Sequence, residues 1–296
     1  MFRFSCADFT FPVLKRLSAL RLIQLLGFDH VDIGLFARSA HFSPIDLRSS
    51  PRSYIERILH DMNDAELEAS DVFLQIGVDP SESAANDPVP SVRTQNRDLF
   101  KRSLEFAVEI GSKHLTGLPG VFHAGVSVDR DLGLAAEVAA WRAAECASAG
   151  IEYAIEPHVG SICGDVASTQ AFLSAVEGMT LTLDYGHFVM AGESSSDVHA
   201  LLPFASHVHV RGGAHDRLQT PVDENTIDFA GMLAGLQRFG YKGFLALEYA
   251  WIDWKGCNRT DNVSETILLR RALELIVSKR ESKQPSGLSS VETSSK

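Results

Sequence analysis

The chain has 296 residues, 45% of them hydrophobic, so it is long enough for one large core and too short for two barrels. Its formal net charge of −11 argues against a nucleic-acid-binding protein, because phosphate binding draws on clustered Lys and Arg. Its four cysteines form no Cys-x-x-Cys pair, which predicts neither a structural zinc nor disulfides and fits a cytoplasmic location.

The first half of the chain alternates between short apolar runs and longer amphipathic segments. Charged residues interrupt the apolar N-terminal stretch, so we expect no signal sequence and no membrane segment. Buried strands are predicted at residues 2–6, 30–33, 72–76 and 114–118. Helices are predicted at residues 12–25, 51–68, 92–110 and 129–149, with Gly27, Gly111 and Gly150 as helix-stop residues.

The segment at residues 79–91 carries three prolines among small polar residues and is predicted to be a long loop. Loops of this length in compact enzymes often cover a site. A surface insertion that the fold merely tolerates is an equally good interpretation.

The second half repeats the alternation, and each of its apolar runs ends in a polar residue. Strands are predicted at residues 151–156, 181–187, 207–211 and 244–248, and helices at 167–176, 197–202, 228–239 and 263–276. Strict alternation indicates a parallel sheet, and eight units indicate closure into a single (β/α)8 TIM barrel of the α/β class over residues 1–278. Residues 279–296 contain little apolar material and are predicted to be a disordered tail.

Parallel strands place their C-terminal ends side by side, so the polar ends of these four strands should meet at one point. The residues concerned are Glu156, Asp184, His209 and Glu248. Three carboxylates and one imidazole suit manganese, magnesium, cobalt or iron(II) better than a sulfur-rich zinc site does. The sequence therefore predicts one divalent metal site, and the alternative is a buried polar cluster whose charges pair without a metal.

These motifs resemble those of the xylose-isomerase-like barrel superfamily, in particular the sugar epimerases and isomerases related to D-tagatose 3-epimerase. The resemblance covers nearly the whole chain up to the tail. It is carried by Glu156 in Ile-Glu-Pro-His, by Asp184-x-x-His187, by His209 in His-Val-His and by Glu248 in Leu-Glu-Tyr. Each motif is weak by itself, but their order is specific for the superfamily, although not for the substrate.

The resemblance implies that the four strand-end residues bind one divalent ion, with manganese as our first expectation, and that Glu156 and Glu248 also act as acid and base. It implies a small carbohydrate or polyol as substrate, and it leaves homo-oligomer formation open. The residues that we expect near the substrate are His187, Arg211, His215, Arg217 and Trp251. His215 is included because related epimerases place an arginine there, and Trp251 because, with Trp254, it would form an apolar wall or a subunit contact.

The chemistry agrees with this assignment. A carbon-bound proton beside a carbonyl can be removed only if the developing enediolate charge is stabilised, and a metal on the carbonyl oxygen supplies that stabilisation. Two glutamates on opposite sides of a sugar would then remove and return the proton. Return to the same carbon gives epimerisation, and return to the neighbouring carbon gives aldose–ketose isomerisation.

Several departures from the pattern keep other functions open. His158 follows Glu156 where the epimerases have a different segment, and it is either an additional base or a residue that shapes the pocket. As a base it would suit a lyase or dehydratase acting on a keto-sugar, an inosose or a 3-keto-glycoside. Endonuclease IV shares the barrel, but the histidine it needs before Pro119 is absent here. A metal-free binding protein on the same barrel is the non-enzymatic alternative.

Overall fold

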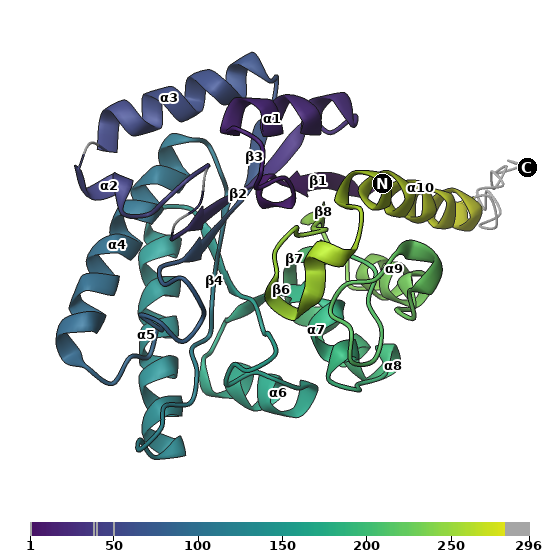
Figure 1. Cartoon of the computed structure of the whole chain (residues 1–296). Coiled ribbons are helices and arrows are strands. Elements are labelled where there is room, and N and C mark those ends of the chain that lie inside the picture. Colours follow the sequence, from purple (N-terminus) through teal and green to yellow (C-terminus); the bar gives the residue numbers. More distant parts are fainter. Residues whose placement is uncertain (1, 38, 40, 50, 282–296) are drawn as a thin grey trace, which may run out of the picture.

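Eight parallel strands form a closed barrel in which each strand pairs with its neighbours in the chain and β8 pairs with β1 (Figure 1). The structure, a computed structural model, describes residues 2–37, 39, 41–49 and 51–281. The strands are β1 (Arg3–Ala7), β2 (His30–Phe36), β3 (Glu68–Gln75), β4 (His114–Gly117), β5 (Glu152–Ile155), β6 (Thr180–Asp184), β7 (Ala205–Val210) and β8 (Phe244–Leu247). The prediction of a (β/α)8 barrel is therefore confirmed.

Helices surround the barrel and cover its outer face (Figure 1). The α-helices are α1 (Arg16–Leu25), α2 (Asp46–Ser49), α3 (Pro51–Asp64), α4 (Pro90–Glu109), α5 (Val128–Ser148), α6 (Val166–Ala175), α7 (Tyr185–Met190), α8 (Ser195–Val198), α9 (Phe229–Arg238) and α10 (Asn262–Glu281). The 3₁₀ segments are η1 (Asp8–Thr10), η2 (His199–Phe204), η3 (Val222–Glu224) and η4 (Trp254–Arg259). The described part of the chain thus has two more α-helices than the eight predicted, because the short helices α2 and α7 were not predicted.

The strand predicted at residues 181–187 is wrong at its C-terminal end. β6 ends at Asp184, and α7 begins at the next residue. The Asp184 side chain caps this helix by accepting a hydrogen bond from the backbone N–H of Gly186 at 2.7 Å. His187 consequently lies on a helix beside the barrel mouth, three residues from Asp184, rather than on the strand itself.

The helix-stop signals in the sequence correspond to left-handed backbone conformations. Gly27 follows α1 with a φ of +86°, and Gly150 follows α5 with a φ of +72°. A side chain is strained in this conformation, so glycine lets each chain reversal occur immediately after its helix. Both reversals return the chain to the start of the next strand of the barrel.

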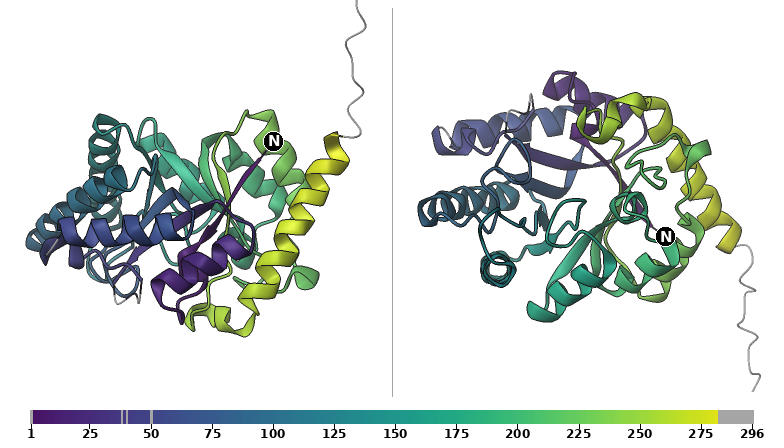
Figure 2. Two further views of the ribbon diagram at one scale, coloured as in Figure 1. Left: turned by 90° about the horizontal axis from the view of Figure 1, so that it is seen from above. Right: turned by 60° about the horizontal axis from the view of Figure 1, so that its bottom comes forward.

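The last helix packs beside the first and completes the outer ring (Figure 2). The Arg270 guanidinium of α10 donates a hydrogen bond to the Leu26 carbonyl at 3.2 Å, just after α1. Helix α10 continues to Glu281, beyond the predicted domain boundary at residue 278, and Arg280 donates to the Ala230 carbonyl at 3.0 Å. Residues 282–296 lie outside the described residues, so disorder there stays a prediction.

The apolar core lies between the strands and the helices, whereas the barrel interior contains many polar side chains. All four cysteines are buried and free. The buried polar residues on the strands are Ser5, Asp32, Ser70, Asp71, His114, Thr116, Thr182, Asp184, His207 and His209. Buried polar groups must find hydrogen-bond partners, so this interior must hold ordered networks.

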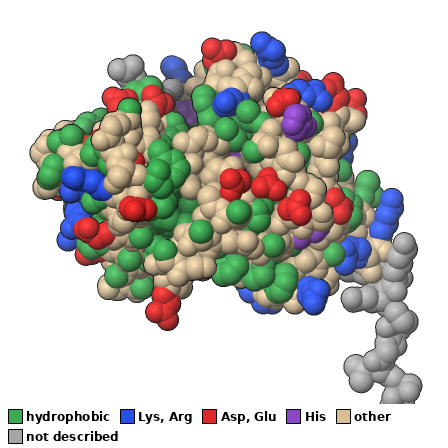
Figure 3. Space-filling view, turned by 90° about the horizontal axis from the view of Figure 1, so that it is seen from below, with side chains coloured by type: hydrophobic (Ala, Val, Ile, Leu, Met, Phe, Trp, Pro, Cys, Tyr) green, Lys and Arg blue, Asp and Glu red, His purple; other side chains and the backbone are tan. Residues whose placement is uncertain are grey.

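The outer surface carries charges of both signs. On the face drawn in Figure 3, Lys and Arg side chains are spread among Asp and Glu side chains rather than gathered into one basic surface. No helix in the described part of the chain is long and apolar enough to cross a membrane.

Candidate metal centre and active site

A cavity of about 430 Å³ opens at the C-terminal ends of the strands, where the sequence places the site. One part of its wall is polar and consists of Glu156, His158, His187, Arg211 and Glu248. Another part is apolar and includes Phe9, Phe36, Phe73, Leu118, Ile252 and Trp254. Cavities of this size with a few convergent polar groups are typical of small-molecule sites.

Two glutamates and one histidine meet in the polar wall. Glu156 directly follows β5, Glu248 directly follows β8, and His209 lies in β7. His209 Nδ1 lies 2.6 Å from Glu156 Oε1 and 3.1 Å from Glu248 Oε2. All three side chains are buried, and Glu248 Oε2 accepts no hydrogen bond from the described residues.

Asp184 and Arg211 form the neighbouring part of the centre. Arg211 Nε donates to Asp184 Oδ2 at 2.9 Å, and Arg211 Nη2 also pairs with Asp184 and lies 3.4 Å from Glu248 Oε2. Asp184, Glu156 and His187 offer ligand atoms that lie within 4.8 Å of one another. Glu156 therefore belongs both to this group and to the group with His209 and Glu248.

The buried charges shift the ionisation of these side chains in different directions. Burial raises the pKa of Glu156 to about 7. Burial would also raise the pKa of Glu248, but the positive charges of Arg211 and His209 hold it below its ordinary value. The two glutamates raise the pKa of His209 well above its ordinary range despite burial. The two carboxyl groups therefore differ in protonation near neutral pH.

The residues fit a divalent cation. Two carboxylates, those of Glu156 and Glu248, lie beside His209 Nδ1, and a lone pair on that nitrogen would repel their oxygens. Either a proton or a cation must therefore sit between them. Oxygen donors with a single imidazole suit manganese, magnesium, cobalt or iron(II). Glu248 Oε2 lies near His209 and Arg211 but accepts no hydrogen bond among the described residues, so it is the kind of buried acceptor that a cation would satisfy.

His158 lies beside this centre and lines the cavity. Its Nδ1 lies 3.1 Å from the carbonyl oxygen of Val159, so Nδ1 carries the hydrogen and Nε2 keeps a lone pair. Nε2 is buried and has no hydrogen-bond partner in the described structure. Burial lowers the pKa of His158 to about 4, which keeps the ring neutral at pH 7.

Three of the residues expected near the substrate are not part of the cavity wall. His215 contacts Asp216 with 71% of its side chain exposed, and Arg217 pairs with Glu224 at the surface. Trp251 is also exposed, whereas Trp254 of η4 lines the cavity. His187 and Arg211 do line it. Substrate contacts by His215, Arg217 and Trp251 thus stay predictions without support from the cavity.

Sequence reasoning missed the aromatic part of the wall. Phe9 follows β1, Phe36 ends β2 and Phe73 lies in β3. The ring of Phe9 lies 4.8 Å from that of Phe36, and Phe36 lies 5.2 Å from Phe73, measured between centroids. Their position near the ends of strands was the available signal, but buried phenylalanines are more often core residues.

The comparisons with known proteins agree with this architecture. The family model described as the xylose isomerase-like TIM barrel matches residues 20–273. The chain belongs to this family. No curated protein matches the sequence.

Solved structures of the same fold include enzymes and a metal complex, all of low sequence identity. L-ribulose 3-epimerase is 16% identical with a TM-score of 0.72, and the match covers 98% of this chain and all of that one. A xylose isomerase-like protein from Mycobacterium smegmatis in complex with magnesium is 15% identical with a TM-score of 0.73, covering 94% and 97%. The probable 3-DHS dehydratase of petrobactin synthesis from Bacillus anthracis is 14% identical with a TM-score of 0.65, covering 90% and 98%.

Proposed function

We propose that the protein is a sugar isomerase or epimerase that depends on one divalent cation held by Glu156, Asp184, His209 and Glu248. The observation that carries this proposal is the approach of Glu156 and Glu248 to the same nitrogen of His209, at 2.6 and 3.1 Å. Membership of the xylose isomerase-like family and the likeness to L-ribulose 3-epimerase support it.

The two glutamates supply the proton transfers. They approach the centre from β5 and β8, so a substrate between them would present a different face to each. When bound, the cation would polarise the substrate carbonyl and make the neighbouring C–H more acidic. One carboxylate takes that proton, and the other carboxyl returns a proton. Return to the opposite face of the same carbon inverts it, whereas return to the adjacent carbon interconverts aldose and ketose.

His187 and Arg211 serve as orienting groups in this proposal. Arg211 Nη2 lies 3.3 Å from His187 Nε2, and both side chains line the cavity. Arg211 also offsets the charges of Asp184 and Glu248, which keeps three carboxylates compatible in one buried place. A substrate hydroxyl or carbonyl oxygen beside these two side chains would be held in one orientation.

A metal-dependent lyase or dehydratase acting on a keto-sugar, an inosose or a 3-keto-glycoside is the second candidate, and His158 favours it. Its Nε2 in the cavity wall has no hydrogen-bond partner among the described residues, so it is placed to accept a proton from a bound substrate. The likeness to the probable 3-DHS dehydratase is compatible with this candidate. Here His158 would remove the proton, and a leaving group on the next carbon would depart.

The decisive experiment compares metal-stripped protein with protein reloaded with manganese, magnesium or cobalt. Each form is incubated with ketoses, inososes and 3-keto-glycosides in deuterated water. Metal-dependent incorporation of deuterium with inversion or carbonyl migration is the expected result. An unsaturated product would favour the lyase, and full activity after rigorous removal of the metal would contradict both candidates.

A further inference from the structure

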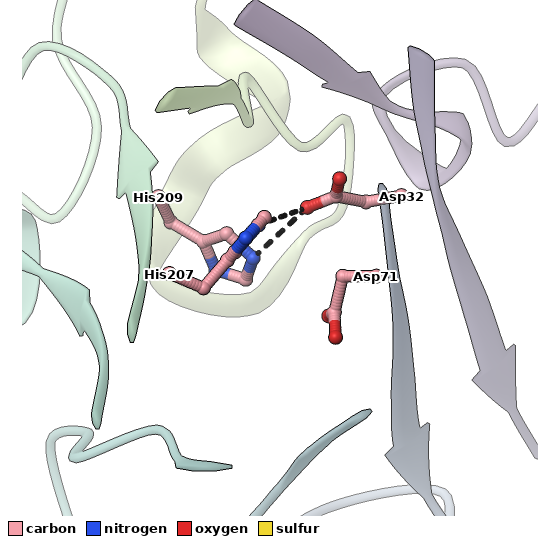
Figure 4. Close-up of side chains that lie close together, drawn as sticks. All are labelled: Asp32, Asp71, His207 and His209. Carbon is pink, nitrogen blue, oxygen red and sulfur yellow. Dashed lines mark hydrogen bonds and ion pairs between the residues drawn. The ribbon is translucent and has the colours of Figure 1, made fainter. Parts of the chain in front are cut away.

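A second group of acidic and histidine side chains lies inside the barrel and shares His209 with the metal centre. Asp32, Asp71, His207 and His209 offer ligand atoms within 4.8 Å of one another, and all four are buried. Figure 4 shows Asp32 opposite the two histidines, with a contact from its carboxylate to each imidazole. The hydrogen bonds of Asp32 show whether this group could bind a second cation.

Asp32 is fully occupied by protein donors. Its Oδ1 accepts hydrogen bonds from the hydroxyls of Ser5 and Ser70. Its Oδ2 accepts from His207 Nε2 at 2.6 Å and lies 3.5 Å from His209 Nε2. A carboxylate has about four lone-pair positions, so the three hydrogen bonds leave one position, and that one faces His209 Nε2. Asp32 thus has no free position for a second cation, and the group is a hydrogen-bonded support rather than another metal site.

This arrangement determines which nitrogen of His209 carries hydrogen. His209 Nε2 is buried and has no hydrogen-bond partner of good geometry among the described residues, and the Asp32 carboxylate stands 3.5 Å away. A nitrogen that faces a carboxylate in a dry interior must be an N–H. Nδ1 faces Glu156 and Glu248, so by the same rule it must hold either a proton or a cation, and with a cation there the ring is neutral and offers its Nδ1 lone pair as the ligand.

We propose that Asp32 is a positioning residue for the metal centre. Asp32 holds the His209 ring so that Nε2–H points toward Asp32 and the Nδ1 lone pair points toward the cation. This inference rests on the proposed function, because it needs a cation at Nδ1. A metal-bound histidine commonly donates its other N–H to a carboxylate, which fixes the ring and raises its basicity. A cation at Nδ1 makes Nε2–H a stronger donor, so the contact with Asp32 should shorten on metal binding.

Asp71 provides a matched control in the same part of the barrel. It is the register partner of Asp32 on the adjacent strand, and both side chains are fully buried. Asp71 also pairs with a histidine, because its Oδ1 lies 2.7 Å from His114 Nδ1. Asp71 belongs to the same group as His209, but its ion pair is with His114, which is not one of the proposed ligands, so loss of the Asp71 charge should leave the tautomer of His209 largely unchanged.

The test compares Asp32→Asn with Asp71→Asn in the full-length chain, with manganese affinity measured by isothermal titration calorimetry and folding checked by thermal melting. An asparagine at position 32 would turn an N–H toward His209 Nε2 and favour the wrong tautomer. We expect Asp32→Asn to weaken manganese binding about 10–100-fold. Asp71→Asn should leave the manganese affinity within about twofold of wild type. Its melting temperature should fall by about as much as that of Asp32→Asn.

Equal manganese affinity in wild type and Asp32→Asn would overturn the role of Asp32 while leaving the proposed function intact. An equal loss in both variants would overturn it too, because a general disturbance of the barrel would then explain the effect. A wild type that binds no divalent ion would instead contradict the proposed function and, with it, this role.

A measurement on the wild type keeps the test independent of how the variants fold. Histidine labelled with nitrogen-15 reports its tautomer by NMR, and the His209 signals are identified by their loss in His209→Gln. With magnesium bound, we expect hydrogen on Nε2 of His209. Hydrogen on Nδ1 in the magnesium-loaded protein would refute the proposal.

Discussion

The two parts of the cavity wall differ in chemistry and in the strands that build them. Strands β5 to β8 contribute the charged part, where Glu156, Arg211 and Glu248 are fixed by ion pairs. Strands β1 to β3 and the segment after β1 contribute uncharged rings that pack on one another, such as Phe9 and Phe36, and Phe73 also packs on the ring of His209 at 5.6 Å between centroids. Charged groups that transfer protons must be placed accurately, whereas an apolar wall needs only a surface that fits the substrate. We therefore interpret the first part as the reaction side and the second as the substrate-holding side.

The strongest test of this division is replacement of the two glutamates. An amide can still offer an oxygen to a cation, but it cannot accept a proton at neutral pH. We expect Glu156→Gln and Glu248→Gln each to lower kcat by about 10²–10⁴ with a much smaller change in KM. Steady-state kinetics with the best substrate from the panel would measure this.

The two glutamine variants should also differ from each other. If each carboxyl serves one face of the substrate, each variant should retain exchange of a different carbon-bound proton with deuterated water. Near-normal kcat in either variant would remove that glutamate from the proton transfers. Identical exchange patterns would show that one group serves both faces.

His158→Ala separates the two candidate functions within the charged part. Under the isomerase or epimerase mechanism the ring only shapes the cavity, so kcat should change by less than about tenfold. Under the lyase mechanism it is the base, and kcat should fall by about 10²–10⁴. An inactive His158→Ala together with an active glutamine variant would replace the first proposal with the second.

The apolar part can be tested with Phe36→Leu. This ring lines the cavity and packs on Phe9 and Phe73, and the change removes part of the wall without creating a charge. Losing a few carbon contacts should raise KM about tenfold and leave kcat within about twofold.

Phe100→Leu is the matched control for this prediction. Phe100 is fully buried between Trp141 and Tyr153, outside the cavity wall, so its replacement should lower stability without raising KM. A fall in kcat with unchanged KM in Phe36→Leu would show that the aromatic part takes part in the reaction and would break the division of roles.

The two parts also differ in how far the sequence predicts them. Glu156, Asp184 and Glu248 each occur at the end of an apolar run, and parallel topology alone brings such ends together. Phe36 and Phe73 each stand next to other apolar residues of β2 and β3, and nothing in the sequence tells an apolar residue of a cavity wall from one of the core. The role of Asp32 was equally hidden, because its partner His207 is 175 residues away in the chain.

A final prediction concerns the pair of Asp8 and His41, which links the segments that form the apolar part of the cavity wall and does not need a metal to do so. Asp8 Oδ1 accepts the Gly34 N–H at 2.8 Å, and Asp8 Oδ2 lies 3.0 Å from His41 Nδ1. The other nitrogen of His41 lies 2.9 Å from the Leu14 carbonyl oxygen, so both ring nitrogens face acceptors and the charged ring is favoured. Burial opposes that charge, but the hydrogen bond to Asp8 raises the pKa of His41 above its ordinary value.

The sign of the pH dependence follows from this direction. Because the folded-state pKa is the higher one, the stabilisation by His41 is fully present below its ordinary pKa and is lost as pH rises through the folded value. Charge-assisted hydrogen bonds contribute about 1.5–3 kcal/mol, so His41→Gln should cost more free energy of unfolding at pH 6 than at pH 9 in urea titrations. Saturating manganese should add the same increment to wild type and His41→Gln, because His41 contacts none of the proposed ligands. An increment that differs between the two proteins would mean that the apolar part and the metal centre are coupled, and the two could no longer be treated as separate.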